Sequence, residues 1–248
     1  MTEDDDLESL PPGLAAAWGV VAPEGRRGPK PAHTVDEVIE VAAGLADAEG
    51  LAGVSLPKVA ARVGVTANAL YRYVSSKDEL VVLLADRAWG DPPALPDGEW
   101  REAAAVWARR LFERFGERPW LLDVPTTVPL TPHNAAWLDA LLAALAPTRM
   151  PAHELLDCAY LLDSHARYGA NLRRNAPTPA ALRRGNPRRA EASRAVRGFL
   201  DDRLRDRGLD AAADVLGDPV FLADEPSVDG FEFGLARILD GIEAHVGR

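Results

Sequence analysis

The sequence predicts an all-α protein that consists of a small N-terminal three-helix domain and a larger helical C-terminal domain. Ala and Leu dominate the apolar positions, whereas only 6 of the 248 residues are Phe, and this composition favours helix over sheet. Apolar residues also recur at three-and-four spacing, which is the spacing of one buried helix face. Prolines at 92, 93 and 96 interrupt this spacing, so we expect domains at residues 26–90 and 91–248.

The segment before the first domain combines an acidic start with Pro and Gly and shows no sustained period. We expect residues 1–25 to be mobile, with residues 14–21 as the part that docks onto the body if any part does. The basic residues that follow are Arg26, Arg27 and Lys30. They form either an arm that enters the minor groove of DNA or a solvated leader.

The first clear helix follows Thr34, whose hydroxyl can cap the helix while Glu37, three residues later, completes a capping box. Gly50 ends this helix of about four turns. The predicted buried face contains Val35, Val38, Ile39, Ala42, Leu45 and Ala46.

Two shorter helices meet at a tight turn and form a helix-turn-helix. Ser55 is a suitable cap for the first, and Pro57 is tolerated in its first turn. Gly64 accepts the positive φ of the turn, Thr66 caps the second helix, and Ala60 permits the helices to approach closely. The residues that fill the angle between the helices are Val59, Val63, Val65 and Leu70.

A fourth helix begins at Ser75 or Ser76, with Glu79 placed for a second capping box, and it bridges the domain boundary. Further helices are predicted at 100–117, 132–146, 151–173, 188–207 and 228–246, separated by breaks rich in Pro or Gly. The segment 175–187 has three prolines and few apolar residues, so we expect a flexible connection there.

Composition excludes several classes of protein. A single cysteine, Cys158, excludes a disulfide framework and a cysteine-rich zinc site, and its apolar neighbours predict a buried thiol. The apolar run 10–22 is broken by Pro and Gly and follows acidic residues, so it is not a signal peptide. No run reaches the ~18 to 20 apolar residues that cross a bilayer. We therefore expect a soluble cytoplasmic protein with no membrane partner.

The charge distribution favours contact with DNA although the net charge is −10. Phosphate contacts by Lys and Arg supply most non-specific affinity, so the average charge argues against a nucleic-acid partner. Residues 25–34 and 55–77, however, contain no acidic side chain. Their basic residues are Arg26, Arg27, Lys30, Lys58, Arg62, Arg72 and Lys77. Such a chain offers DNA one basic face while its acidic body repels phosphates elsewhere.

The segment VSLPKVAARVGVTANALYRYVSSKDEL resembles the tetracycline-repressor family of transcription regulators, and the similarity covers residues 34–86. The resemblance implies that Tyr71, Tyr73 and Lys77 contact phosphates and that Asn68, between two alanines, faces base edges in the major groove. The predicted DNA-contacting residues are Lys58, Thr66, Ala67, Asn68, Ala69, Tyr71, Arg72, Tyr73 and Lys77. Three helices packed for stability alone would not need this excess of basic residues.

The C-terminal segment FEFGLARILDGIEAHV resembles the last helix of the tetracycline repressors, which forms half of a dimeric four-helix bundle. Gly234 and Gly241, seven residues apart, would let a partner helix approach closely. The apolar face consists of Phe231, Leu235, Ile238 and Ile242. A helix buried within one chain would show the same pattern, and it is the resemblance that implies a homodimer through the C-terminal helices.

The resemblance also implies an effector pocket between the helices of one subunit. The predicted lining is Trp107, Leu111, Trp120, Pro125, Trp137, Leu138 and His165. Trp107 and Pro125 occupy the positions of the family's drug-holding His and Asn, so tetracycline with its magnesium ion is not expected. A bulky apolar or aromatic effector fits better, with His165 or Asn171 as a polar anchor. Most of the large side chains would also serve as core.

Basic residues gather in the C-terminal domain as well, with Glu191 as the only acidic residue opposing them. The cluster is Arg167, Arg173, Arg174, Arg183, Arg184, Arg188, Arg189, Arg194 and Arg197. It either neutralises an anionic effector or acidic partner, or forms a solvated face beside the flexible connection.

These observations predict a ligand-responsive DNA-binding regulator, more specifically a repressor that releases a pseudo-palindromic operator when a small molecule binds. An activator remains open. An enzyme is the alternative from another class, but the sequence has no G-x-S-x-G, no H-E-x-x-H and no Gly-rich phosphate loop. An architectural DNA-binding protein would not need the large acidic body. We expect no catalytic residue, metal or cofactor.

Overall fold

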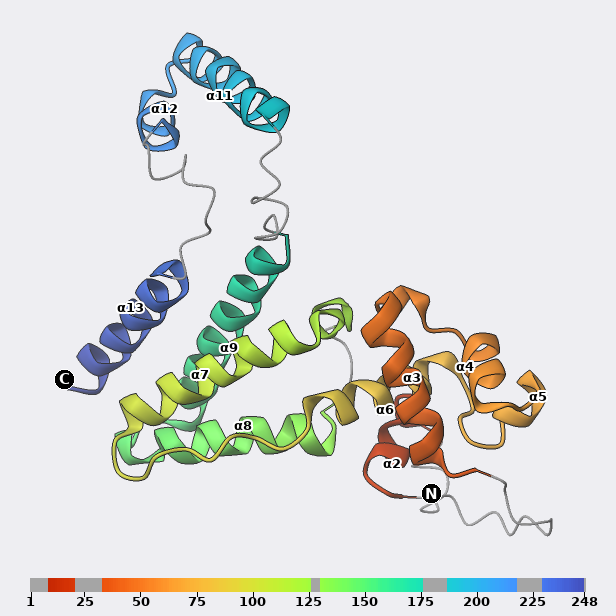
Figure 1. Cartoon of the computed structure of the whole chain (residues 1–248). Coiled ribbons are helices and arrows are strands. Elements are labelled where there is room, and N and C mark those ends of the chain that lie inside the picture. The colour runs from red at the N-terminus through yellow and green to blue at the C-terminus, as the bar shows by residue number, and fades with distance from the viewer. Residues whose placement is uncertain (1–8, 21–32, 126–129, 176–186, 218–228, 248) are drawn as a thin grey trace.

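The computed structural model describes residues 9–20, 33–125, 130–175, 187–217 and 229–247, and all regular elements in these ranges are helices (Figure 1). The predicted all-α fold is confirmed. The N-terminal helices are α2 (Leu14–Ala17), α3 (Val35–Glu49), α4 (Leu56–Val63), α5 (Ala67–Leu70) and α6 (Lys77–Trp89). The C-terminal helices are α7 (Trp100–Glu117), α8 (Pro132–Leu145), α9 (Ala152–Asn175), α11 (Pro187–Asp206), α12 (Asp210–Leu216) and α13 (Asp229–Val246). Short 3₁₀ turns are η1 (Leu51–Gly53), η2 (Pro119–Asp123) and η3 (Ala146–Thr148).

The predicted capping box of α3 is present. The Glu37 backbone N–H donates to Thr34 Oγ1 at 3.1 Å, and the Thr34 N–H donates to the Glu37 carboxylate at 3.2 Å. The predicted face is buried apart from Val35, which is 42% exposed because it lies in the first turn, beyond the helices that cover the rest.

The helix-turn-helix forms as predicted, with one difference at its first cap. Gly64 lies in the left-handed region at φ 88°, and Thr66 Oγ1 accepts from the Ala69 N–H at 3.2 Å. The Ser55 hydroxyl, in contrast, makes no capping hydrogen bond. Pro57 removes one of the two N–H groups from which a cap can accept, but the N–H of Lys58 is also not bonded to Ser55.

Helix α6 begins at Lys77 and carries the chain from the N-terminal domain into the body. Ser76 is its cap and accepts from the Glu79 N–H at 3.0 Å. The Glu79 carboxylate does not reach back to Ser76 but accepts from the N–H of Ser75, at 2.6 Å, and from its hydroxyl. Both candidate serines are therefore used at this terminus.

One apolar core runs through both parts of the chain, from Val38 to Ile242. In the body, α7 packs along α9, α13 lies on α9 and α7, and α8 contacts α6, α7 and α9 (Figure 1). Trp89, at the end of α6, contacts Phe115 and Trp137, with ring centroids 5.8 and 5.9 Å apart. Helix α6 is therefore part of the body's core as well as of the N-terminal domain.

Part of the segment for which the sequence predicted mobility lies against the body. Helix α2 packs on α6, and a methyl group built on Gly13 would come within 3.0 Å of Glu79 and Val82. Trp18 Nε1 donates to the Leu130 carbonyl at 3.0 Å. This arrangement corresponds to the predicted docking of residues 14–21. Residues 26–30, the candidate arm, lie outside the described residues.

Helices α11 and α12 pack on each other and lie apart from the other helices in Figure 1. α11 closely matches the predicted helix at 188–207, whereas α12 was not predicted. Several large apolar side chains of this pair are exposed: Val196, Phe199, Leu200, Leu209, Val215 and Leu216. The connection predicted at 175–187 lies almost wholly outside the described residues.

Cys158 is a buried free cysteine, as its apolar neighbours predicted. Burial raises the pKa of its thiol, and the carboxylates of Glu154 and Asp157 raise it further. Within the described ranges, no helix is both long and apolar enough to span a membrane.

Candidate DNA-binding surface and ligand cavity

The turn between α4 and α5 positions one exposed surface. Val59, Ala60, Leu70 and Val74 are buried beneath it, so the opposite sides of both short helices face outward. This surface contains most of the predicted DNA-contacting residues. Thr66, Ala67, Asn68, Tyr71, Arg72 and Lys77 are exposed, and Ala69 and Tyr73 are half-buried. We call these eight residues, with Lys58, the reading surface.

Two members of the reading surface have structural roles as well. The Thr66 hydroxyl caps α5, so one of its lone pairs is already occupied. Tyr73 packs against the core with part of its ring, whereas Tyr71 is 52% exposed. An extended phenol such as Tyr71 can reach a phosphate without a change in the protein.

Lys58 makes an ion pair that the sequence did not predict. Its ammonium group donates to Glu49 Oε2 at 2.7 Å. Glu49 lies nine positions earlier, outside the acid-free window, and the turn η1 brings it beside α4. The pKa of the Glu49 carboxyl is lowered chiefly by the hydrogen bond and charge of Lys58, with a smaller contribution from Arg62.

A cavity of about 440 Å³ lies within the body, between α6, α7, α8, α9 and η2. This volume is within the range of small-molecule sites. Its apolar wall includes Ala85, Trp89, Trp107, Leu121, Trp137 and Leu138, and its polar groups belong to Thr131, Asn134, Tyr160, Asp163 and Arg167. The wall is mainly apolar and aromatic, with a polar end on α8 and α9.

Two of the three tryptophans of the wall, Trp107 and Trp137, use their indole N–H groups within the protein. Trp107 Nε1 donates to the Trp137 carbonyl at 2.8 Å, and Trp137 Nε1 donates to the Gly90 carbonyl at 3.0 Å. Because both of these N–H groups are occupied, neither is available to a ligand, and most of the polar groups of the cavity lie at its polar end on α8 and α9. There, Arg167 Nε lies 3.4 Å from the Asp163 carboxylate, and its guanidinium is 4.7 Å from the Phe115 ring centroid.

Four of the seven predicted pocket residues line this cavity, namely Trp107, Pro125, Trp137 and Leu138. Leu111 does not, because it is fully buried in the core. Trp120 is directed away to α3, where its Nε1 donates to Asp47 at 2.7 Å. His165 Nε2 donates to the Phe231 carbonyl at 2.8 Å, so this side chain lies under α13. The predicted anchor Asn171 bonds to Arg174 and Asn175 instead.

Thr131, Asn134, Asp163 and Arg167 were not among the residues predicted to line the pocket, because that prediction rested on the family resemblance and on large amphipathic side chains. Tyr160, Asp163 and Arg167 recur at three-and-four spacing on α9. They therefore share one side of that helix. A polar stripe inside an otherwise packed helix is a signal from which the sequence could have predicted them.

His165 belongs to a stack of four side chains that joins α7, α9 and α13. Its ring stacks on Phe231 at 4.9 Å, Phe231 stacks on Phe112 at 4.3 Å, and the Arg173 guanidinium lies 4.2 Å from the Phe112 centroid. A methyl group on Gly234 would lie 2.3 Å from His165 Cε1. Gly234 therefore makes room within one chain, and the prediction that it admits a partner helix is wrong for this residue.

The described members of the arginine cluster, Arg167, Arg173 and Arg174, each contact other groups of the C-terminal domain. The contacts of Arg167 and Arg173 are described above. Arg174 donates to Asp123 at 2.8 Å and to the Pro119 carbonyl at 3.1 Å. Arg167 lines the cavity, whereas Arg173 and Arg174 are exposed but paired with groups of α7 and η2, so the three do not form one common site. The side chains of Arg183, Arg184, Arg188, Arg189, Arg194 and Arg197 lie outside the described residues.

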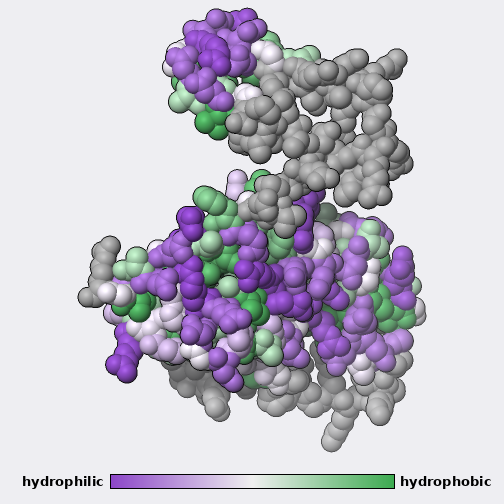
Figure 2. Space-filling model, turned by 60° about the vertical axis from the view of Figure 1, so that its left-hand side comes forward, coloured by the Kyte–Doolittle hydropathy of each residue, from purple (hydrophilic) through white to green (hydrophobic). Residues whose placement is uncertain are grey.

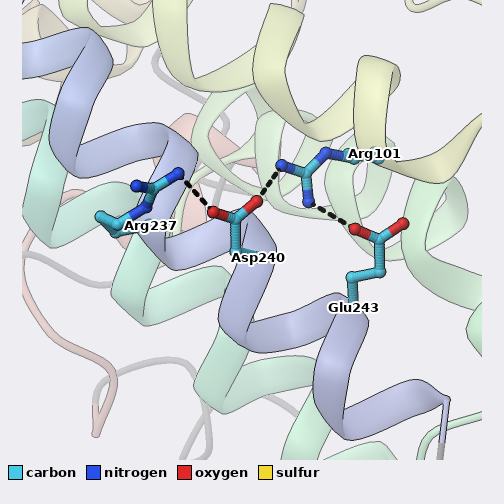
Figure 3. Close-up of polar contacts among 4 residues, drawn as sticks. All are labelled: Arg101, Arg237, Asp240 and Glu243. Carbon is cyan, nitrogen blue, oxygen red and sulfur yellow. Dashed lines mark hydrogen bonds and ion pairs between the residues drawn. The ribbon is translucent and has the colours of Figure 1, made fainter.

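Ion pairs fasten α13 to α7 along the exposed edge of their contact (Figure 3). Arg101 of α7 bridges Asp240 and Glu243 of α13, with 3.1 Å to the Glu243 carboxylate, and Arg237 also reaches Asp240. Nearer the start of α13, Arg109 binds both oxygens of Glu232 at 2.9 and 2.8 Å. The bidentate bond from Arg109 lowers the pKa of the Glu232 carboxyl.

The buried residues of α13 are Phe231, Leu235, Leu239 and Ile242, and the predicted Ile238 is partly buried against the same core. This face packs within the chain, on α9 and α7. The other side of α13 and the neighbouring side of α9 expose large side chains, and Figure 2 shows hydrophobic surface on this side of the molecule. The exposed set is Leu161, Tyr168 and Leu172 of α9 and Phe233 of α13. We call it the α9–α13 surface. Nothing lies within 4 Å of a methyl group built on Gly241.

Besides the Trp18–Leu130 and Trp137–Gly90 hydrogen bonds, two further connections join the N-terminal helices to the body. Asp86 of α6, which is 8% exposed, accepts from the His133 N–H at 2.9 Å and pairs with His133 Nδ1 at 2.8 Å. Trp120 of η2 reaches Asp47 of α3, as described above. The cavity wall includes a sequence neighbour of each connection, namely Ala85 next to Asp86 and Leu121 next to Trp120.

Comparison with known families gives two matches that together span most of the chain. The profile described as bacterial regulatory proteins, tetR family, matches residues 38–84. The profile described as tetracyclin repressor-like, C-terminal domain, matches residues 92–246.

Individual proteins give a consistent result. The chain is 36% identical over 226 residues to the HTH-type transcriptional repressor DrrR1 of Streptomyces coeruleorubidus, covering 90% of this chain and 82% of that protein. An HTH-type transcriptional regulator of Saccharopolyspora erythraea is 32% identical over 134 residues, which is 53% of this chain and 56% of that protein. Among solved structures, ActR of Streptomyces coelicolor in complex with actinorhodin is 23% identical and superimposes with a TM-score of 0.70, over 88% of this chain and 99% of that one.

Proposed function

Because the chain belongs to the tetracycline-repressor family of bacterial regulatory proteins, a family of transcription factors and not of enzymes, we propose that it is a repressor that a small molecule releases from its operator. One observation carries the ligand-dependent part of this proposal. Ala85 and Trp89 in the cavity wall belong to α6, and the same helix begins at Lys77 of the reading surface. Helix α6 therefore connects the ligand cavity to the reading surface. The S. coeruleorubidus relative is a transcriptional repressor by name, which supports repression over activation.

On DNA, the segment from Thr66 to Tyr73 lies in the major groove. Asn68 pairs with a base edge, while Tyr71, Tyr73 and Lys77 hold phosphates on either side. Two subunits place two such segments in successive major grooves about one helical turn apart, on a pseudo-palindromic operator. The protein then acts on chromosomal DNA in the cytoplasm.

The dimer forms through the α9–α13 surface. A second copy would cover Leu161, Leu172 and Phe233, which are 55%, 56% and 66% exposed in the single chain. Two helices from each subunit then make a four-helix bundle. Gly241, with open space around it, lies where a partner helix can approach. Several large apolar side chains exposed on neighbouring helices are the feature that supports an interaction site here.

The ligand is a bulky molecule that is mainly apolar or aromatic. The rings of Trp107 and Trp137 supply most of its contact area, and Asn134, Asp163 and Arg167 fix its orientation. Solved structures of ActR contain actinorhodin or (S)-DNPA, which supports the assignment of an organic ligand to this protein.

The ligand acts by moving α6. It binds beside the Asp86–His133 and Trp120–Asp47 connections, and it displaces α6 and η2 relative to each other. The separation of the two reading surfaces in the dimer changes, and DNA affinity falls by the coupling free energy between the sites. A ligand that binds both conformations equally would have no effect.

Selection of bound sequences from a random duplex pool tests the DNA-binding part. The purified protein is expected to enrich a pseudo-palindrome, for which affinity falls steeply as salt concentration rises. Absence of any enriched sequence at low salt would exclude the reading surface as an operator-binding site.

Tryptophan fluorescence then tests the ligand-dependent part. Aromatic compounds that quench the cavity tryptophans are added to the protein on its selected operator, and binders are expected to lower operator affinity. Ala159→Phe, which fills the cavity from α9, should remove both the quenching and the release. If compounds bind without any change in operator affinity, the cavity has no regulatory role.

A further inference from the structure

A carboxylate lies within the basic surface at the point where α4 approaches DNA. Glu49 is the last residue of α3, and Lys58 is the third residue of α4. Their side-chain atoms meet at 2.7 Å, and both side chains are accessible to solvent. Every residue from position 55 to position 77 is neutral or basic, so the fold, and not its place in the sequence, brings Glu49 into this surface.

The backbone holds the stem of Glu49 in position. A methyl group built on Gly53 would lie 2.5 Å from Glu49 Cβ, so η1 packs on Glu49 at a distance that only glycine permits. The carboxylate therefore extends from a fixed Cβ toward α4. Arg62, one turn after Lys58 on α4, adds to the positive charge that keeps the Glu49 carboxylate ionised.

An ionised Glu49 affects phosphate binding in two ways. Lys58 must give up or share its hydrogen bond with Glu49 before it neutralises a phosphate, and the carboxylate itself repels the backbone of DNA. Non-specific complexes gain essentially all of their affinity from phosphate contacts. The Glu49 carboxylate therefore reduces the affinity for non-specific DNA more than the affinity for the operator. Operator complexes also gain from base contacts, which hold α4 close enough to the backbone for a phosphate to displace Glu49.

We propose that Glu49 is a specificity-determining residue, which keeps Lys58 from the phosphates of non-cognate DNA and so increases the ratio of operator to non-specific affinity. The inference rests on the proposed contact of the reading surface with DNA. It assigns to Glu49 a role in discrimination between DNA sequences although it contacts no base.

The experiment compares four full-length proteins: the wild type, Glu49→Gln, Lys58→Gln and the double variant. Affinity for a random-sequence duplex and for the selected operator is measured against salt concentration. Glu49→Gln should steepen the salt dependence on random duplex by about 0.9 per subunit and tighten that complex roughly threefold or more, with no change of slope on the operator. Lys58→Gln should leave the random-duplex slope of the wild type unchanged but remove the added slope in the Glu49→Gln background.

Two controls separate this effect from others. Glu113→Gln removes a carboxylate that is also paired with a basic residue, Arg110, but on α7 of the body, and it should leave both slopes unchanged. Glu49→Asp keeps the charge but shortens the side chain, and should give an intermediate slope on random duplex.

The outcomes that overturn the proposal are distinct from those that overturn the DNA-binding surface. If Lys58→Gln flattens the slope in the wild-type background, Lys58 already contacts phosphates and Glu49 does not restrain it. If Glu49→Gln tightens both DNAs equally, Glu49 has no role in specificity. Lys77→Ala is the reference variant. If Lys77→Ala weakens DNA binding and Glu49→Gln changes neither affinity nor salt slope, only the role of Glu49 is contradicted. If neither variant changes DNA binding, the reading surface itself is not the DNA-binding site.

Discussion

At the scale of single residues, glycines of the body leave room for large side chains of the neighbouring helices. A methyl group would lie 1.5 Å from Arg173 at Gly116 and 3.1 Å from Phe231 at Gly169. With Gly234, they surround the stack of His165, Phe231, Phe112 and Arg173. The stack fixes how α9 lies against α7 and α13, because its rings and guanidinium occupy space that a larger residue at these glycines would fill.

Gly234→Ala is expected to destabilise the protein by about 1 to 3 kcal/mol, because the new methyl group forces His165 from its place over Phe231. Urea unfolding of the full-length protein measures this change. The control is Gly44→Ala in α3, where the same methyl group meets open space and should stabilise the helix by up to about 1 kcal/mol. Equal stability of Gly234→Ala and the wild type would show that the stack adapts without cost.

Two residues of the reading surface should have different effects on DNA binding. Lys77→Ala is expected to weaken binding to all sequences and to reduce the salt slope by about 0.9 for each phosphate that the lysine neutralised. Asn68→Ala is expected to cost about 1 to 3 kcal/mol on the operator and to relax specificity at one base pair, because it removes a base contact and no charge. Binding of Lys77→Ala with wild-type affinity would contradict the phosphate contact assigned to this residue.

At the scale of elements, α13 is attached to the body by two kinds of interaction. Its apolar face, including Leu235 and Leu239, is buried against α9 and α7. Its outer edge carries the ion pairs of Arg101 and Arg109 with α13 carboxylates. The apolar contact supplies most of the free energy, because exposed ion pairs contribute only about 0 to 1 kcal/mol each.

The attachment of α13 should weaken at acidic pH. The pKa of Glu232 is lowered in the folded protein by the bond from Arg109, from an ordinary value of 4.5. Stability from this pair is therefore complete above the unfolded pKa and is lost as pH falls through the lower folded pKa. A double-mutant cycle of Arg109→Gln and Glu232→Gln should give a coupling well under ~1 kcal/mol near neutral pH, and this coupling should fade as the folded carboxyl is protonated. A coupling that persists in acid strong enough to protonate Glu232 would exclude the ionised carboxylate as its source.

At the scale of the whole molecule, two groups of exposed apolar side chains stand out among the described residues. One is the α9–α13 surface, and the other is the pair α11 and α12, whose exposed residues include Phe199 and Val215. The first is continuous with the core of the body through two long packed helices. The second belongs to helices that lie apart from that core (Figure 1).

Leu161→Glu is expected to shift the protein from dimer to monomer, because it places a charge in the centre of the proposed four-helix bundle. Sedimentation measures the oligomeric state, and operator affinity should fall at the same time, since a monomer holds only one half-site. Val215→Glu on α12, with a side chain of nearly equal exposure, is the matched control. A dimer of unchanged stability in Leu161→Glu would place the subunit contact elsewhere.

Local signals were sufficient for most of the fold. The Thr34–Glu37 capping box, the glycine at position 64 and the three-and-four spacing of apolar residues predicted the helices from α3 to α9 and α13 to within a few residues. Each of these signals acts between residues close in sequence, through backbone hydrogen bonds or a helix face. The short helix α12 was missed because its seven residues have little periodicity.

The sequence by itself determined the fold class, the helix-turn-helix and the exposed surface that carries Asn68, Tyr71 and Lys77, because these depend on caps, turns and periodicity within short segments. Only the tertiary structure decided the pairing of Glu49 with Lys58, the role of Gly234 and the residues that line the cavity. These depend on which helix faces come together, and many faces of a helical chain are equally apolar. The volumes of the side chains decide which of these faces pack together. The cavities that remain between packed helices therefore cannot be located from the sequence.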